Sequence, residues 1–329
     1  MGDLNRLHDM RSLDRSEAYS IMNDMISGAL SEVRLSATLA SLNHRELQLE
    51  EVLGFRDAML EHCARIDLGK AACMDFCGTG GDGKDTFNIS TSTAILLGAM
   101  GIPVVKHGNY GVSSSCGSSN VLEAIGYRFP TTADEARARF ERHGTVFLHA
   151  PFFHPAMRNV APVRKALGVR TLFNIMGPLS NPALPTHQLT GTFDLSTQRL
   201  FAWSLEQIGV EAAVVHSLDG HDEISLTSEA RVFSTQKHFH LLSAKDFGAE
   251  PVQQGDILGA KSLEGNGALL QNILCGGGTD AQRRVVAANA AMAITVWDLT
   301  QTLPAAYQKA LDILDSGQAG LHLQNLIAS

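Results

Sequence analysis

The sequence has little of what marks secreted, membrane-spanning or nucleic-acid-binding proteins. Its 329 residues include five cysteines, and no two of them form a CxxC pair, so neither a disulfide framework nor a zinc site is indicated. The longest apolar stretch, 93–105, contains two glycines and a proline and is shorter than the roughly 20 residues that span a bilayer. The net charge of −8 is opposite in sign to the basic field of a general nucleic-acid binder.

We expect no targeting signal in the first residues of this sequence. The first ten residues, MGDLNRLHDM, lack the apolar core of a signal peptide, and Arg6 stands where a myristoylation motif has Ser or Thr. A hydrophobic content of 44% is typical of a globular protein, and the length admits two domains or one large α/β unit. We therefore expect a cytoplasmic protein with reduced thiols that binds neither membrane nor nucleic acid and captures any anionic ligand locally.

The pattern of apolar residues changes near residue 70. The first 65 residues or so have apolar side chains at three- and four-residue intervals, which predicts helices at 16–30, 35–42 and 48–64. From Ala71 onward, short apolar runs end in glycine-rich turns and alternate with helical segments, as in a parallel βαβ sheet. The fold class expected is α/β, with a small helical domain and a mostly parallel sheet. Predicted strands are 73–77, 104–105, 146–148, 212–216 and 231–234; predicted helices are 91–100, 120–125 and 132–143, each stopped by a glycine.

The run GTGGDG at 78–83 follows the first predicted strand and invites two nucleotide-binding interpretations. It fits the spacing of a dinucleotide fingerprint, but no helix follows at once and no acidic residue stands about 20 positions on. It also resembles a P-loop, yet Asp85 occupies the position of the magnesium-binding Ser or Thr. Both interpretations lack their required context, and an anion-binding glycine turn remains.

Two further segments have the composition of phosphate cradles. Asn88 to Thr91 precede an apolar helix, where hydroxyls and free N–H groups favour an anion, although an ordinary helix cap would look the same. The segment 106–118, KHGNYGVSSSCGS, combines a cation, many small hydroxyls and three glycines that let the backbone approach a ligand. A purely structural loop seldom needs all of these together.

An acidic segment, DGHDE at 219–223, follows the predicted strand 212–216. Adjacent carboxylates at the C-terminal end of a strand suit magnesium, which takes oxygen ligands and shares itself with substrate phosphates. Taken alone, such a segment is more often a solvated turn. Beside three phosphate cradles, it is interpretable as the metal-binding arm of a polyphosphate site.

In order and in detail, these motifs resemble those of the anthranilate phosphoribosyltransferases of tryptophan biosynthesis. The matching stretches cover about half of the chain: GTGGDG at 78–83, TFNIST at 86–91, KHGN at 106–109 with its following SS and CGS, HPAMRNVAPVRKALGVRTLFNIMGPLSNP at 154–182, and GHDEIS at 220–225. The helical N-terminus and Asn289 within its predicted helix are also similar. The resemblance implies a small helical domain at 1–68, joined by the segment from about 155 to 182, and a large domain at 69–154 and 183–329. It further implies a homodimer formed through the helical part.

The implied reaction is the second step of tryptophan biosynthesis from chorismate. The ribosyl C1 of phosphoribosyl pyrophosphate (PRPP) is transferred to the amine of anthranilate, with release of pyrophosphate and with Mg²⁺ as cofactor, two ions per site when PRPP is bound. The resemblance assigns to PRPP Gly78, Gly81, Asp82, Thr86, Asn88, Ile89, Ser90, Thr91, Lys106, His107, Gly108, Asn109, Tyr110, Gly111, Val112, Ser113, Ser114 and Ser118. It assigns to anthranilate Gly78, Asn109, Arg164, His107, His154, Gly177 and Pro178, and to the metal Ser90, Asp222 and Glu223.

This assignment agrees with the chemistry that the reaction requires. Departure of pyrophosphate leaves negative charge that a metal and fixed N–H donors can neutralise. An arylamine is unprotonated at neutral pH, so we assign no catalytic base. The planar fork of Arg164 suits the anthranilate carboxylate. His107 and His154 could equally be packed histidines. One departure is Tyr110, because the family commonly has Arg after KHGN.

Two rival functions stay open at this point. A pyrimidine nucleoside phosphorylase would share the architecture and the chemistry at an anomeric carbon, but it would not need Asp222 and Glu223. A non-catalytic relative that binds nucleic acid would have eroded phosphate motifs and a basic groove, whereas this chain has complete motifs and a charge of −8.

Overall fold

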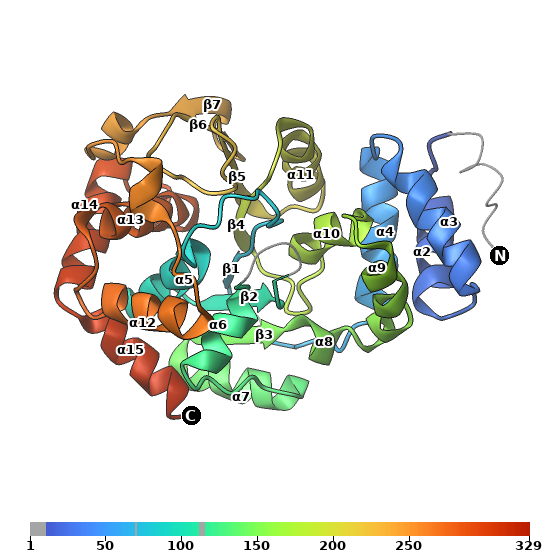
Figure 1. Cartoon of the computed structure of the whole chain (residues 1–329), viewed down its shortest axis with the longest axis horizontal. Helices are drawn as coiled ribbons and strands as arrows, with labels where there is room; N and C mark the ends of the chain where they lie inside the picture. The colour runs from blue at the N-terminus through green and yellow to red at the C-terminus, as the bar shows by residue number, and fades with distance from the viewer. Residues whose placement is uncertain (1–10, 70, 112–115) are drawn as a thin grey trace.

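The computed structural model describes residues 11–69, 71–111 and 116–329, and within them it has a bundle of helices beside a seven-stranded sheet (Figure 1). The strand order is β3-β2-β1-β4-β5-β6-β7. The first five strands are parallel, and β6 and β7 add an antiparallel hairpin at one edge. The strands are β1 (Met74–Phe76), β2 (Val104–Gly108), β3 (Thr145–His149), β4 (His187–Gly191), β5 (Glu211–Ser217), β6 (Ala230–Ser234) and β7 (His238–Leu242). The expected α/β class with a mostly parallel sheet is confirmed.

The five predicted strands all exist, but the sequence reading missed β4 and β7. Strand β4 has the polar sequence HQLTG and lies between β1 and β5, where pairing on both sides buries it. Strand β7 lies at the edge of the sheet, and most of its side chains reach solvent. Neither strand has the apolar run that predicts a strand. Strand β4 forms because its position between two strands buries it, and β7 forms because it pairs with β6 in a hairpin.

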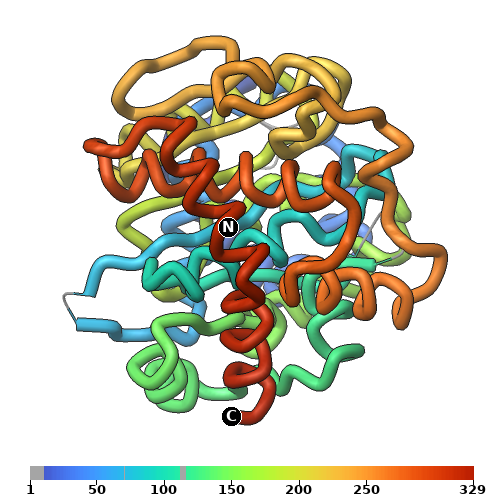
Figure 2. Tube along the Cα trace, turned by 90° about the vertical axis from the view of Figure 1, so that its left-hand side faces the viewer, coloured from blue at the N-terminus to red at the C-terminus, as the bar shows by residue number. Residues whose placement is uncertain are grey.

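Helices cover both faces of the sheet. The N-terminal bundle consists of α2 (Arg15–Ile26), α3 (Glu32–Asn43) and α4 (Leu49–Glu61). Between these helices and β4 lie α5 (Ile89–Ala99), α6 (Ser118–Ala124), α7 (Ala133–His143), α8 (Ala150–Phe153), η1 (Pro155–Asn159), α9 (Ala161–Leu167), α10 (Leu172–Met176) and η2 (Gly177–Leu179). After β4 come α11 (Leu195–Gln207), η3 (Ala244–Phe247), η4 (Gln254–Ile257), α12 (Leu263–Leu274), α13 (Asp280–Trp297), α14 (Leu303–Asp315) and α15 (Gln318–Ile327). The C-terminal helices face the viewer in Figure 2.

The helix boundaries follow local signals. Asp14 caps α2 with a reciprocal Asp14–Glu17 capping box, and Gly101, Gly126 and Gly144 follow α5, α6 and α7 with positive φ, as the sequence predicted. The first helix is shorter than expected, since it ends at Ile26 rather than at residue 30, with Gly28 at φ +79° just beyond it.

The buried apolar residues form two large cores and a smaller cluster, in which α7 and α8 pack on β2 and β3. The larger core lies between the sheet and helices α5 and α12 to α15, with the alanine-rich α13 packed against α5, α14, β4 and β5. The second core joins α2, α3 and α4 to α9, α10 and α11. The segment that contains α9 and α10 therefore packs against the bundle although it follows β3 in the chain (Figure 1). Among the described residues, no helix has both the length and the apolar character that crossing a lipid bilayer requires.

Candidate active site

A cleft of about 280 Å³ lies where β1 and β2 end, which is where parallel sheets place their ligand sites. It brings together predicted residues from five separate segments of the chain. The predicted residues that line it are Gly78, Gly81, Asp82, Thr86, Asn88, Ile89, Ser90, Lys106, His107, Gly108, Asn109, Tyr110, Gly111, Ser118, Arg164, Gly177, Pro178, Asp222 and Glu223. Two predicted residues, Thr91 and His154, are buried and do not line the cleft. Val112, Ser113 and Ser114 lie outside the described residues.

The glycine loop, residues 78–83, is fixed by backbone hydrogen bonds. The N–H of Thr79 donates to the carbonyl of Gly191 at 2.9 Å, and the N–H of Gly80 donates to Oδ2 of Asp222 at 2.9 Å. Gly80 and Gly81 have φ of +62° and +77°, which side-chain-bearing residues rarely adopt. The loop is thus a preformed turn of small residues beside the acidic segment.

The segment 88–91 begins helix α5 and touches two other parts of the site. The side-chain amide of Asn88 donates to the carbonyl of Cys116 at 3.2 Å, and the N–H of Ser90 donates to Oε1 of Glu223 at 3.0 Å. The hydroxyl of Ser90 lies 3.5 Å from Nζ of Lys106. Since Thr91 is buried inside the first turn of α5, Ser90 is the residue of this segment that connects the acidic pair with the cation.

Asn120, in α6, ties together two glycines of the segment 106–118. Oδ1 of Asn120 accepts from the N–H groups of Gly111 and Gly117 at 3.0 and 3.1 Å, which closes the neck of the loop. Tyr110, at the position where the family commonly has Arg, donates from its hydroxyl to Glu123 at 2.9 Å and packs on the ring of His149 at a centroid distance of 4.4 Å. In this chain the residue after KHGN therefore anchors the loop to α6 and to the end of β3.

The acidic side chains of the cleft have raised pKa values. Burial and the nearby Asp82 raise the pKa of Asp222 to about 7, and burial together with Asp222 raises the pKa of Glu223 well above its usual value. Oε2 of Glu223 is buried and has no hydrogen-bond partner among the described residues. The described residues include no cluster of three or more His, Cys, Asp or Glu side chains that could hold a metal. The unpartnered carboxylate oxygen and the crowding of negative charge fit a divalent cation that takes its other ligands from a substrate.

Asn289 of α13 fixes the position of the acidic segment, and sequence reasoning noted this residue only as part of a similar helix. Its amide accepts from the N–H of Ile224 at 3.1 Å and donates to the carbonyl of the same residue at 2.8 Å. A Cβ atom at Gly191 would overlap the carbonyl oxygen of Asp222, so β4 can approach this segment only with a glycine there. Both contacts join residues far apart in the chain, and no local pattern reveals them.

The opposite side of the cleft holds an unpaired cation. The guanidinium of Arg164, on α9, lies 5.3 Å from the ring centroid of Phe173 and has no hydrogen bond or ion pair with another described residue. Burial lowers the pKa of Arg164 from its ordinary value. A half-buried arginine with free donors is suited to a carboxylate, which it can bind through two parallel hydrogen bonds.

The two predicted histidines differ in their access to the cleft. Nδ1 of His107 lies 3.2 Å from the carbonyl of Gly177, and because a carbonyl only accepts, we assign the ring proton to Nδ1. Nε2 of His107 then presents a lone pair that is buried and without a partner among the described residues. Burial, together with the neighbouring His154, lowers the pKa of His107 to about 3, so the ring is neutral. His154 packs behind it at a centroid distance of 5.1 Å and is tied to the carbonyl of Ser180.

The helical bundle, the mostly parallel sheet and the glycine-rich loops that line the cleft place the chain in a class of glycosyl-transferring enzymes. Residues 4–63 match the glycosyl transferase family, helical bundle domain, and residues 70–320 match the glycosyl transferase family, a/b domain. The chain belongs to the anthranilate phosphoribosyltransferase family. It is 42% identical over 316 residues to the anthranilate phosphoribosyltransferase of Christiangramia forsetii, covering 96% of this chain and 95% of that protein. It is 42% identical over 324 residues to that of Flavobacterium johnsoniae, covering 98% and 97%.

Solved structures agree with this assignment. The anthranilate phosphoribosyltransferase of Thermus thermophilus superposes with a TM-score of 0.94 at 34% identity, covering 100% of this chain and 99% of that one. The Saccharomyces cerevisiae enzyme, solved in complex with PRPP and Mg, superposes with a TM-score of 0.88 at 23% identity over 99% and 96% of the two chains, which is a likeness of fold.

Proposed function

We propose that this protein transfers the phosphoribosyl group of PRPP to the amine of anthranilate and releases pyrophosphate, the second step of tryptophan biosynthesis from chorismate. The observation that carries the proposal is one cleft with two chemically opposite sides. The glycine loop and the half-buried Asp222 and Glu223 lie on one side, and the unpaired guanidinium of Arg164 lies on the other. A diphosphate with a divalent cation suits the first side, and an aromatic carboxylate suits the second.

The roles follow from the charges that the reaction creates. The bond between C1 of ribose and the pyrophosphate oxygen breaks, the bond between C1 and the amine nitrogen forms, and the nitrogen loses a proton. Backbone N–H groups of the three loops would hold the diphosphate as it gains charge. Arg164 would hold the anthranilate carboxylate and so keep the amine near C1, which supplies rate through proximity. No side chain is assigned as the base.

Magnesium is the cofactor that we propose, with two ions per site when PRPP is bound. Ser90, Asp222 and Glu223 would hold it, and the unpartnered Oε2 of Glu223 supports this set. When bound, the metal supplies electrophilic neutralisation of the departing pyrophosphate. The protein's own contribution is to keep two carboxylates, whose pKa values burial raises, close to the diphosphate site.

We also propose the domain arrangement and the assembly that the family resemblance implies. A helical domain at 1–68 would be joined by the segment from about 155 to 182 to a large domain at 69–154 and 183–329. The packing of α9 and α10 against α3 supports this division. Two chains would associate through the helical part, and the protein would act in the cytoplasm, in keeping with five free cysteines.

Loss of anthranilate fluorescence tests the function directly. Purified protein should consume anthranilate only when PRPP and magnesium are both present. Thymidine with phosphate serves as the alternative substrate pair, and turnover of that pair alone would replace our proposal with a nucleoside phosphorylase. Calorimetry with PRPP and Mg²⁺ supplies a readout that does not require turnover, and absence of binding heat from folded protein would contradict the proposal.

A further inference from the structure

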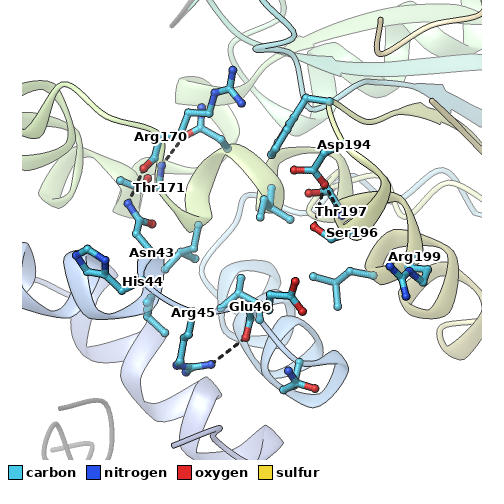
Figure 3. Close-up of a pocket in the computed structure, with 18 of the residues that line it drawn as sticks. Asn43, His44, Arg45, Glu46, Arg170, Thr171, Asp194, Ser196, Thr197 and Arg199 are labelled. Atoms are coloured by element: carbon cyan, nitrogen blue, oxygen red, sulfur yellow. Dashed lines mark hydrogen bonds between the residues drawn. The ribbon is translucent and has the colours of Figure 1, made fainter. Parts of the chain in front are cut away.

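A second cavity, of about 650 Å³, lies between the turn that joins α3 to α4, the start of α10 and the start of α11 (Figure 3). It is outside the cleft described above, although Asn174 lines both. Arg170 stands on its wall, in the short connection between α9 and α10. Sequence reasoning gave this arginine no role.

Arg170 makes contact with three segments that are distant in the chain. Its guanidinium donates from Nη2 to the carbonyl of Gly81, and its Cζ lies 4.7 Å from the ring centroid of Phe193. Its own carbonyl accepts from Nδ2 of Asn43 at 2.6 Å, at the end of α3. One residue therefore connects the helical bundle, the glycine loop and the segment after β4.

The contact with Gly81 bears on the cleft because of where the glycine loop is otherwise held. The first part of the loop is fixed at Thr79 and Gly80 by Gly191 and Asp222. Further along, the carbonyl of Gly81 points to Arg170, and the side chain comes so near that a Cβ atom at Gly81 would lie 3.2 Å from Nε. Since a peptide unit is planar, fixing this carbonyl also fixes the N–H of the next residue.

We propose that Arg170 is a positioning residue for the diphosphate of PRPP, and that Asn43 sets the position of Arg170 from the helical bundle. Arg170 does not line the cleft itself; it acts by holding the glycine loop in the conformation that presents its N–H groups. The inference rests on the proposed function, because it concerns the same donor substrate. It gives the bundle a part in PRPP binding through a chain of two hydrogen bonds.

The test compares Arg170→Ala with Arg170→Lys and with a matched control. Arg199 lines the same cavity, and its side chain makes no hydrogen bond or ion pair with another described residue, so Arg199→Ala is the control. A hydrogen bond from a charged donor is among the stronger kinds, but Arg170 is exposed and solvent takes part of its strength. We expect Arg170→Ala to raise the KM for PRPP by about fivefold to tenfold, with kcat and the KM for anthranilate changed less than about twofold. Arg170→Lys should fall between Arg170→Ala and the native protein.

A double-mutant cycle tests the connection to the bundle. Asn43→Ala should raise the KM for PRPP in the same direction but less, and Asn43→Ala combined with Arg170→Ala should equal Arg170→Ala alone, because both act on one chain of contacts. Additive effects would overturn the role of Asn43. An unchanged KM for PRPP in Arg170→Ala, or a fall in melting temperature without a change in KM, would overturn the role of Arg170.

Binding measurements keep this inference separate from the proposed function. Native protein that does not turn over PRPP and anthranilate would refute the function. Calorimetric titration with magnesium pyrophosphate would then still decide the inference. Arg170→Ala should weaken pyrophosphate binding about fivefold to tenfold, matching the expected rise in the KM for PRPP. Equal affinity in the native protein and the variant, or no binding to either, would overturn it.

Discussion

Replacing Asp222 with Asn should make the metal-free protein more stable above neutral pH. Burial and Asp82 raise the pKa of Asp222 from 3.8 to about 7. Each tenfold change in proton affinity is about 1.36 kcal/mol, so a pKa higher by about 3 sets a ceiling of about 4 kcal/mol. Because the side chain is only half-buried at the floor of the cleft, solvent reduces this, and we expect about 2 kcal/mol.

The direction of this pH dependence follows from proton linkage. The folded state holds the proton more tightly than the unfolded chain, so the penalty is absent below pH 4, grows as the pH rises through 7 and is complete near pH 8. Asp222→Asn cannot ionise, and its amide oxygen can still accept from the N–H of Gly80. The stability advantage of the variant should therefore grow by about 1 to 2 kcal/mol between pH 5 and pH 8.

Urea unfolding of both proteins at pH 5 and pH 8, with and without magnesium chloride, measures this difference. Magnesium should stabilise the native protein and stabilise Asp222→Asn less, because a ligand that binds only the folded state adds to its stability. Asp219→Asn is the matched control in the same segment. Although burial favours protonated Asp219, hydrogen bonds from Thr227 and His221 lower its pKa, so this variant should lose stability at neutral pH. Parallel pH profiles for native protein and Asp222→Asn would refute the reasoning.

Three further predictions concern other parts of the site. Arg164→Ala should raise the KM for anthranilate roughly tenfold or more and the KM for PRPP far less, because we propose that the free guanidinium of Arg164 binds the anthranilate carboxylate. Equal effects in steady-state kinetics would reject that role. Asn289→Ala should lower the free energy of unfolding by about 2 to 3 kcal/mol, measured with urea, because it removes buried hydrogen bonds to Ile224 and Val285. It should also weaken magnesium binding in calorimetry. A loss of stability with unchanged metal affinity would mean that Asn289 supports only the fold. Small-angle scattering should show compaction when PRPP and anthranilate are both bound, because the cleft has α9 and α10 on one side and the sheet on the other; an unchanged radius of gyration would exclude closure.

The alternation of strands and helices was predictable because each signal is local. Glycines with positive φ stop α5, α6 and α7, and apolar runs mark β1, β2, β3, β5 and β6. Strand β4 could not be predicted in this way, since its burial comes from its neighbours β1 and β5 rather than from its own composition. The same holds for β7, which pairs with β6 at the edge of the sheet.

The residues of the candidate site also differ in whether local sequence signals reveal them. Motif residues such as Gly81, Ser90 and Glu223 could be found because glycines, hydroxyls and carboxylates stand together in short segments. Arg170 and Asn289 could not, because their partners lie 89 and 65 residues away in the chain. Thr91 shows that not every residue of a matching motif reaches the cleft. It belongs to TFNIST and the resemblance assigns it to PRPP, but helix α5 directs its side chain into the core.

The charges of the cleft explain why it needs both a cation and fixed donors. Asp82, Asp222 and Glu223 would repel a diphosphate that arrived alone. Burial first, and the neighbouring carboxylates second, raise the pKa values of Asp222 and Glu223, so the charged forms are already unfavourable. Lys106 does not offset this fully, since its Nζ donates to the carbonyl of Phe76 at the end of β1. Under the proposed function, this crowded arrangement becomes favourable when a divalent cation and a diphosphate bind together, because the cation neutralises both the carboxylates and the diphosphate. Under the proposed function, keeping all three carboxylates favours ligand binding at the expense of folding stability.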